Sequence, residues 1–299
     1  MNIMETIKTH GLLFDGAMGS MLISRGLEGG ESPESWNLKH PDRIRDIHRA
    51  YFDAGADVAS ANTFGGTAMK LEKMGVTASM EEINRAAVRI AREACGPGQF
   101  VAGDFGDLGE MLAPMGPVAF EDAVACFSDQ AAVMADEGVD LFIIETVFDI
   151  NLALAAIRAI RSVSGIPVAC SLTFKETPRG FFTIFGNAPG DSMKSLVDEG
   201  CSVVGANCAM GSDTMIRLAE EIKTSTDIPV IIQPNAGLPE TGPGQSVSYP
   251  ENADFFADNI MKIKALGIEV VGGCCGTTPD YIRTVKNRLS KREETDDKS

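Results

Sequence analysis

Three cysteines carry the clearest chemical signal in the sequence. Cys208 follows an apolar run, and Cys274 and Cys275 are adjacent within the glycine-rich segment 272–279. Three thiolates suit Zn²⁺, which binds sulfur tetrahedrally and keeps one position open in catalytic sites. Adjacent side chains normally diverge, but the glycines of that segment permit the backbone angles that let both sulfurs reach one ion. Spacing alone leaves a second interpretation, in which Cys274 and Cys275 form a packed or disulfide-bonded pair and Cys208 is a buried apolar residue.

The number and position of the histidines and cysteines limit which side chains can be the reactive groups. Only three histidines occur, all within the first 50 residues: His10, His40 and His48. A histidine-based metal site or triad would have to come from that segment alone, so sulfur and carboxylates are the expected reactive groups. Seven cysteines are an odd number and predict no disulfide framework. This cysteine usage favours a reducing compartment.

The composition argues against several functional classes. Lys plus Arg number 26 against 42 Asp plus Glu, a formal net charge of −16. Such an acidic protein is not expected to bind nucleic acid or an anionic membrane. The apolar runs are far shorter than the ~18 residues that span a bilayer. The N-terminus lacks a basic region followed by an apolar core, so we expect no signal peptide and a cytoplasmic location.

Short apolar runs alternate with amphipathic helical segments along the whole chain. Eight strands are predicted, at residues 12–14, 57–61, 99–103, 139–145, 167–174, 202–207, 229–233 and 268–272. Eight evenly spaced strand–helix units favour a single-domain (β/α)8 TIM barrel, an α/β fold, over a doubly wound open sheet. The barrel is assigned to residues 1–290, and the charged residues 291–299 are expected to form a disordered tail. Residues 175–189, rich in Gly, Pro and Thr, are the longest expected loop and a candidate rim or lid.

In such a barrel the active site lies at the C-terminal ends of the strands. Cys208 follows the sixth predicted strand, and Cys274 and Cys275 follow the eighth, so the three sulfurs are expected to converge above the seventh. The same rim receives four further candidates from strands one, four and seven: Asp15, Gly16, Glu145 and Asn235.

Motifs along nearly the whole chain resemble those of the homocysteine S-methyltransferase family. The most specific are Gly-Ala-Asn-Cys at 205–208 and Gly-Gly-Cys-Cys-Gly-Thr-Thr-Pro at 272–279. Others follow in the family's order: Asp-Gly-Ala-Met-Gly at 15–19, Asn-Thr-Phe at 62–64, Glu-Thr-x-x-Asp at 145–149 and Pro-Asn-Ala-Gly at 234–237. Within the family, the chain is most similar to the homocysteine-binding barrel of cobalamin-dependent methionine synthase.

The resemblance implies roles for the candidate residues. It implies one zinc ion per chain, held by Cys208, Cys274 and Cys275. It implies that Asn235 is a displaceable fourth ligand or a near neighbour of the metal. Finally, it places the substrate amino and carboxylate groups beside three residues: Asp15, Gly16 and Glu145.

Local structural roles remain as alternatives for several of these residues. Asp15 could cap the helix that follows it, and Glu145 could form a salt bridge on the rim. Asp149 is expected to be a helix N-cap. The stretch around His48 begins like the Asp-x-His-x-x-Gly motif of corrinoid proteins, but Tyr51 stands in place of the glycine, so His48 is expected to be structural.

The resemblance implies methyl transfer to a zinc-bound thiolate, with homocysteine converted to methionine and no acid–base residue in the central step. The expected donor is methylcobalamin on a corrinoid partner or another part of a split enzyme, because the resembled enzyme carries its corrinoid on a separate domain. The first alternative is a small onium donor, S-methylmethionine or betaine; Gly65 disfavours betaine, whose users have Tyr near that position. Two further alternatives for the function are methyl transfer to a different thiol acceptor and a non-catalytic zinc or redox protein that uses Cys274 and Cys275.

Overall fold

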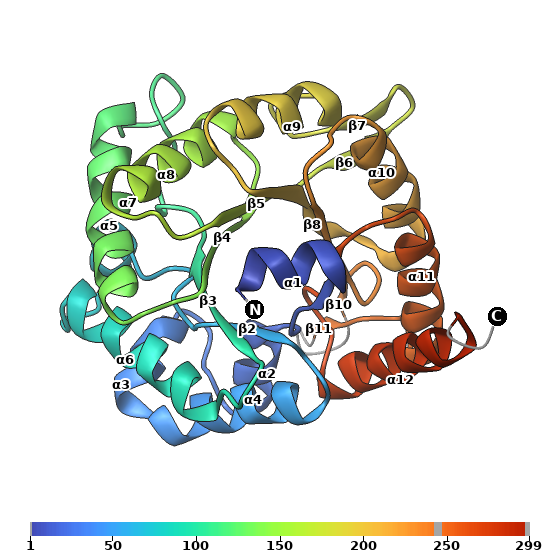
Figure 1. Ribbon diagram of the computed structural model, residues 1–299. Helices are drawn as coiled ribbons and strands as arrows, with labels where there is room; N and C mark the ends of the chain where they lie inside the picture. The colour runs from blue at the N-terminus through green and yellow to red at the C-terminus, as the bar shows by residue number, and fades with distance from the viewer. Residues whose placement is uncertain (1, 242–246, 297–299) are drawn as a thin grey trace.

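Eight parallel strands form a barrel with helices around it (Figure 1), in a computed structural model that describes residues 2–241 and 247–296. The strand order is β1–β12–β9–β8–β5–β4–β3–β2, and a parallel bridge between Phe14 and Val58 joins the two ends of the sheet. The predicted (β/α)8 barrel is therefore confirmed. The barrel strands are β1 (Leu12–Leu13), β2 (Val58–Ser60), β3 (Phe100–Phe105), β4 (Leu141–Val147), β5 (Val168–Leu172), β8 (Val203–Gly211), β9 (Val230–Asn235) and β12 (Val270–Val271).

The helices pack their apolar faces against the outside of this sheet. In α4 (Pro41–Asp53), for example, Ile44, Ile47 and Tyr51 recur at helical spacing and are fully buried. The others are α1 (Ile3–Thr9), α2 (Met18–Ser24), the 3-10 helix η1 (Pro33–Ser35), α3 (Trp36–Lys39), α5 (Ala68–Lys73), α6 (Met80–Ala94), α7 (Phe120–Asp136), α8 (Ile150–Val163), α9 (Pro189–Asp198), α10 (Ser212–Thr224), α11 (Ala253–Ala265) and α12 (Pro279–Asp296). In the part of the chain that the structure describes, no helix is both long and apolar enough to cross a membrane.

The first helix closes the end of the barrel opposite the expected site. Figure 1 shows α1 lying across the centre of the strand ring. Ile3 and Ile7, one turn apart, pack against barrel-lining residues such as Leu12 and Val270. A capping box between Asn2 and Glu5 fixes the start of this helix. Solvent is thereby excluded from this end of the barrel.

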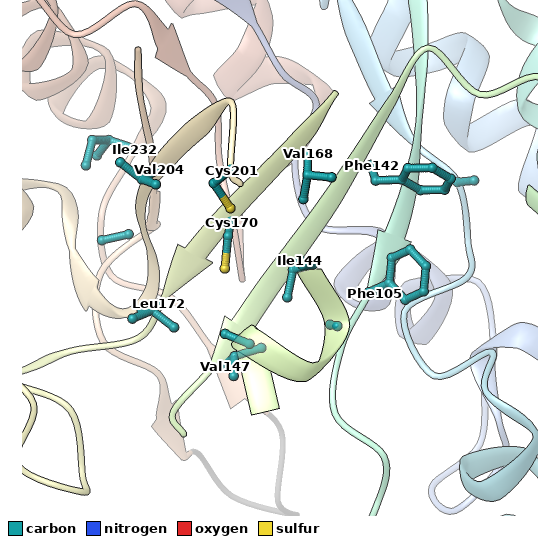
Figure 2. Close-up of a cluster of buried hydrophobic side chains, with 14 of the residues drawn as sticks. Phe105, Phe142, Ile144, Val147, Val168, Cys170, Leu172, Cys201, Val204 and Ile232 are labelled. Carbon is teal, nitrogen blue, oxygen red and sulfur yellow. The ribbon is translucent and has the colours of Figure 1, made fainter. Parts of the chain in front are cut away.

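A second apolar layer lies between the strands and the helices. Figure 2 shows part of it, with Phe105 and Phe142 at one side; their ring centroids are 5.7 Å apart. Cys170 and Cys201 lie next to each other in the same layer, and burial raises the pKa of Cys170 well above its usual value. These two cysteines behave as small hydrophobic residues.

Three predicted elements differ from the structure by more than two residues at a boundary. The predicted loop 175–189 contains a hairpin of β6 (Lys175–Thr177) and β7 (Gly180–Phe182), and a second hairpin pairs β10 (Glu240–Thr241) with β11 (Val247–Ser248). The predicted disordered tail overlaps α12, whose helical residues run past position 290; residues 297–299 lie outside the described residues. Strand β8 extends four residues beyond the prediction, so Cys208 lies inside the strand. The pairing of β8 with β9 is irregular between Asn207 and Gly211, so the alternation typical of a strand does not continue through this part of β8.

His48 is structural, as predicted, and its burial gives stability a pH dependence. The ring is fully buried in α4, and neither nitrogen has a hydrogen-bond partner among the described residues. Burial lowers the pKa of His48 to about 4, below the ordinary value of 6.5. The unfolded chain therefore binds more protons between these values. The stability that the neutral ring contributes is fully present above pH 6.5 and is lost as the pH falls toward 4.

Replacing His48 with leucine is expected to remove this pH dependence. Between pH 7 and pH 5 the free energy of unfolding of the unmodified protein should fall by about 2 kcal/mol through this residue alone. Urea unfolding of both proteins at the two pH values measures the difference. His10→Gln, at an exposed position, serves as the control. An equal loss in His48→Leu and the unmodified protein would show that other groups cause the acid sensitivity.

Candidate functional site

The three predicted cysteines converge at one point on the barrel rim. Cys208 comes from β8, and Cys274 and Cys275 from the turn between β12 and α12. The three sulfurs lie within 4.8 Å of one another, and the sulfurs of Cys208 and Cys275 are 3.9 Å apart. A tetrahedral zinc ion with Zn–S bonds of about 2.3 Å separates its sulfur ligands by about 3.8 Å. The donor set and its spacing therefore fit zinc.

Unusual backbone geometry brings these sulfurs together. Cys208 and Ala209 have φ angles of 61° and 55°, in the left-handed region that non-glycine residues rarely occupy. Gly276 has a φ of 82°, and a Cβ there would lie 2.2 Å from the ring of Tyr249. Glycine is therefore required directly after the cysteine pair, as the sequence indicated. Tyr249 itself was not predicted; it hydrogen bonds to Cys275, and that contact acts to lower the pKa of the thiol.

Hydrogen bonds among the three thiols shift their pKa values in opposite directions. Hydrogen bonds from Cys274 and Cys275 lower the pKa of Cys208 to about 3. The same contacts with Cys208 raise the pKa of Cys274 well above its usual value and that of Cys275 to about 11. Metal binding would displace the remaining protons, because thiolates and not thiols are zinc ligands.

Asn235 lies beside this sulfur cluster, at the end of β9. Its side chain is only 3% exposed, and its hydrogen bond to Cys208 contributes to the lowered pKa of that thiol. The amide oxygen Oδ1 is buried without a hydrogen-bond partner among the described residues. The structure thus places Asn235 next to the cluster, while its role as a ligand remains a prediction.

A cavity of about 330 Å³ opens beside two of the sulfurs. Of the predicted site residues it brings together five: Asp15, Gly16, Glu145, Cys274 and Cys275. Cys208, the third cysteine of the cluster, and Asn235 are not part of its lining. Residues to which the sequence assigned no individual role complete the wall: Ala17, Met18, Gly19, Ser20, Pro33, Glu34, Ser60, Ala61, Asn62, Phe64, Asp104, Thr146, Gln233 and Gly273.

Asp15 and Gly16 are held firmly at the wall of this cavity. Asp15 is 3% exposed and accepts a hydrogen bond of 2.9 Å from the backbone N–H of Ser60. Burial raises its pKa well above the usual value. Asp15 does not cap the following helix, because Ala17 is the N-cap residue of α2. A Cβ on Gly16 would lie 2.6 Å from the hydroxyl of Thr277, so a larger residue would not fit.

Glu145 lines the cavity and is not engaged in a salt bridge with another described residue. No lysine or arginine within 2–241 or 247–296 forms an ion pair with it, which removes the rim salt-bridge alternative. Burial, and then the nearby Cys208, raise its pKa to about 7. Asp149, in contrast, accepts a hydrogen bond from the backbone N–H of Asn151 and is the N-cap predicted from the sequence.

Two more carboxylates face the cavity and were missed by the sequence analysis. Asp104, one residue before the end of β3, is 6% exposed, and its Oδ1 has no hydrogen-bond partner among the described residues. Glu34 comes from η1 and accepts a 2.7 Å hydrogen bond from the N–H of Gly65. The position of Asp104 at a strand end was a usable signal, whereas nothing local marked Glu34. Among the residues that the structure describes, no lysine, arginine or histidine lines the cavity, so its carboxyl groups suit a cationic group such as an ammonium.

Comparison with known proteins shows the family of this chain. The family model for homocysteine S-methyltransferases matches residues 12–289, so the chain belongs to that family. The chain is 32% identical to the methionine synthase of Mycobacterium leprae over 97% of its length, and 31% identical to that of Mycobacterium tuberculosis over 95%. It spans only about a quarter (25%) of each of these relatives.

Solved structures give the same fold. The metallated form of the homocysteine methyltransferase MmuM from Escherichia coli superposes with a TM-score of 0.79 at 21% identity, covering 95% of this chain and 98% of that one. The oxidised form of the same enzyme gives a TM-score of 0.78 at 22% identity, with 94% and 97% covered. At these identities the likeness establishes the barrel fold alone.

Proposed function

We propose that this protein methylates homocysteine to methionine, with zinc held by Cys208, Cys274 and Cys275 and the methyl group supplied by a methylcorrinoid. One observation carries the proposal. Two of the three converging sulfurs, those of Cys274 and Cys275, line the same cavity as several carboxyl groups. Homocysteine has matching groups, a thiol at one end and an ammonium at the other. Membership of the family and the likeness to methionine synthases support the same substrate.

The residues of the chain have separate tasks in this reaction. Glu145 and Asp15 bind the substrate ammonium group, and with it they fix the distance from that group to the sulfur. Zinc, when bound, would keep the substrate thiol ionised at neutral pH. Asn235 would be a neighbour of the ion or its displaceable fourth ligand. The thiolate attacks the methyl carbon, so that an S–C bond forms. The cobalt–carbon bond breaks with its electron pair left on cobalt, and the thiol proton has gone to solvent.

Ionisation alone does not account for a useful rate. A few per cent of a free thiol is already ionised at neutral pH, so complete ionisation gains at most about 2 kcal/mol. The remaining rate enhancement must come from aligning the sulfur with the methyl carbon. The buried wall of carboxyl groups is suited to that alignment, because it holds the far end of the substrate in one orientation. No acid–base residue is required at the reacting atoms.

The surface beside the cavity supports a large donor. A hollow of about 650 Å³ adjoins the cavity, and Phe64 and Thr146 line both. Met115 and Ile184, on its wall, are 65% and 56% exposed. Such an apolar rim suits the broad face of a corrinoid brought by a partner protein or by another part of a longer enzyme. A cytoplasmic setting belongs to the same proposal, because zinc thiolates stay reduced there.

Methyl-donor assays test the proposal directly. The purified, zinc-loaded protein is expected to form methionine from homocysteine and methylcobalamin, measured by chromatography. Parallel reactions contain S-methylmethionine or betaine as the donor. Methionine from either of these but not from methylcobalamin would show that the donor assignment is wrong. Turnover of a thiol that lacks the amino acid end, at the same rate as homocysteine, would remove the roles of Glu145 and Asp15.

A further inference from the structure

We propose that Asn207 is a positioning residue that couples the metal-binding sulfurs to the strand end that carries Glu145. For its substrate this inference rests on the proposed function, whereas the zinc-affinity measurement that tests it requires no turnover of that substrate. Asn207 is fully buried, at the position before Cys208 in β8. Its side chain makes contacts in both directions, toward Thr146 on β4 and toward Cys274.

The contact with Thr146 is reciprocal. The backbone N–H of Thr146 donates to Asn207 Oδ1 at 2.8 Å, and Asn207 Nδ2 donates to Thr146 Oγ1 at 2.8 Å. Thr146 has a φ of 58°, in the left-handed region, which a β-branched residue adopts only when its surroundings enforce it. The two hydrogen bonds between Asn207 and Thr146 stabilise this backbone conformation.

Both strands lose their regular register at this contact. The pairing of β4 with β5 shifts between Ile144 and Val147, and that of β8 with β9 shifts between Asn207 and Gly211. In a regular strand successive side chains face opposite sides. Glu145 and Thr146 are successive residues, yet both line the cavity. Leu141 and Ile143 lie in the barrel interior, so regular alternation already points Glu145 inward. The irregularity that Asn207 holds in place turns Thr146, which would otherwise face outward, toward the cavity beside Glu145.

Strand β5 lies between β4 and β8 (Figure 1) and connects the two irregular segments. Directly after it, the backbone N–H of Thr173 donates to Val147 O at 2.9 Å. The hydroxyl of the same residue donates to Asn207 O at 3.2 Å. The ends of three neighbouring strands thus form one hydrogen-bonded unit, with the Asn207 side chain at its centre.

The same amide group reaches the sulfur cluster. Asn207 Nδ2 lies 3.7 Å from Cys274 Sγ, within range of an N–H···S hydrogen bond. Hydrogen bonds to ligand atoms orient them and adjust metal affinity, and their loss typically costs about 10- to 100-fold. One side chain therefore affects both the metal affinity and the placement of the carboxylate that would bind the substrate.

Two variants separate the two contacts. Asn207→Asp keeps an acceptor for the N–H of Thr146 but loses the donor to Cys274, so its zinc affinity is expected to fall by about 10-fold or more. The isosteric Thr146→Val removes only the hydroxyl, so its zinc affinity should stay within about twofold of the unmodified protein while the KM for homocysteine rises with little change in kcat. Zinc affinity is measured by competition with a chromophoric chelator, which requires no turnover.

Asn84→Ala is the matched control. Asn84 is an equally buried amide that donates to Gly66 O at 2.7 Å, away from the sulfurs, so its loss should lower stability and leave zinc affinity unchanged. An unchanged zinc affinity in folded Asn207→Asp would overturn the proposal, as would a loss in Asn84→Ala of the same size. Should Asn207→Asp not fold, an unchanged KM in Thr146→Val overturns it instead. If no protein forms methionine, the proposed function fails while the zinc measurement still decides the role of Asn207.

Discussion

Replacing Cys208 with alanine is expected to lower bound zinc from about one ion per chain to nearly none, and methyl transfer with it. Cys208 supplies one of three sulfurs that lie within 4.8 Å of one another. Loss of a mere hydrogen-bond partner of a ligand costs about 10- to 100-fold in affinity, so loss of the ligand itself should cost more. Elemental analysis of the purified protein, with a parallel activity assay, measures both effects.

The control for this experiment is another cysteine of the same chain. Cys126 is half-buried on α7 and lies outside the cluster, so Cys126→Ala should keep its zinc and its activity. If Cys208→Ala binds as much zinc as Cys126→Ala, the three-sulfur site is wrong. If the unmodified protein binds zinc but methylates no thiol, the non-catalytic zinc or redox alternative gains support.

Glu145→Gln should raise the KM for homocysteine by about 10- to 100-fold and change kcat much less. A hydrogen bond to a charged group contributes about 1.5–3 kcal/mol, and 1.4 kcal/mol corresponds to a factor of ten. The carboxylate holds the far end of the substrate, so its loss weakens binding more than the chemical step. Initial rates at varied homocysteine concentration separate the two constants.

The same residue predicts how binding depends on pH. Burial, and then Cys208, raise the pKa of Glu145 to about 7, so the carboxylate becomes neutral as the pH falls through that value. The KM of the unmodified protein should therefore rise between pH 8 and pH 6, and that of Glu145→Gln should rise less. Glu121→Gln, at an exposed position on α7, should behave like the unmodified protein. Parallel KM profiles in all three proteins would argue against Glu145 as the ammonium-binding group.

The barrel and the sulfur cluster could be predicted from the sequence for a physical reason. Apolar periodicity and the glycines that end helices are local signals. Eight successive strand–helix units leave few arrangements that bury every strand. Parallel strands in a closed barrel end on one rim, so Cys208 and the pair Cys274–Cys275 had to lie near each other once the strand count was known. The family resemblance then singled out Asp15 and Glu145, and the structure places both at the cavity.

The detailed geometry of the site was decided only by the tertiary structure. The sequence pattern placed Cys208 after its strand, whereas the strand continues to Gly211 through a left-handed turn. Glu34 and Tyr249 reach the site from segments whose local pattern gives no sign of it. A side chain's direction at a bulge, and its contacts across the barrel, depend on hydrogen bonds between residues far apart in the chain. The pair formed by Asn207 and Thr146, 61 positions apart, is such a case, because two hydrogen bonds join the left-handed backbone of Thr146 to a side chain on another strand.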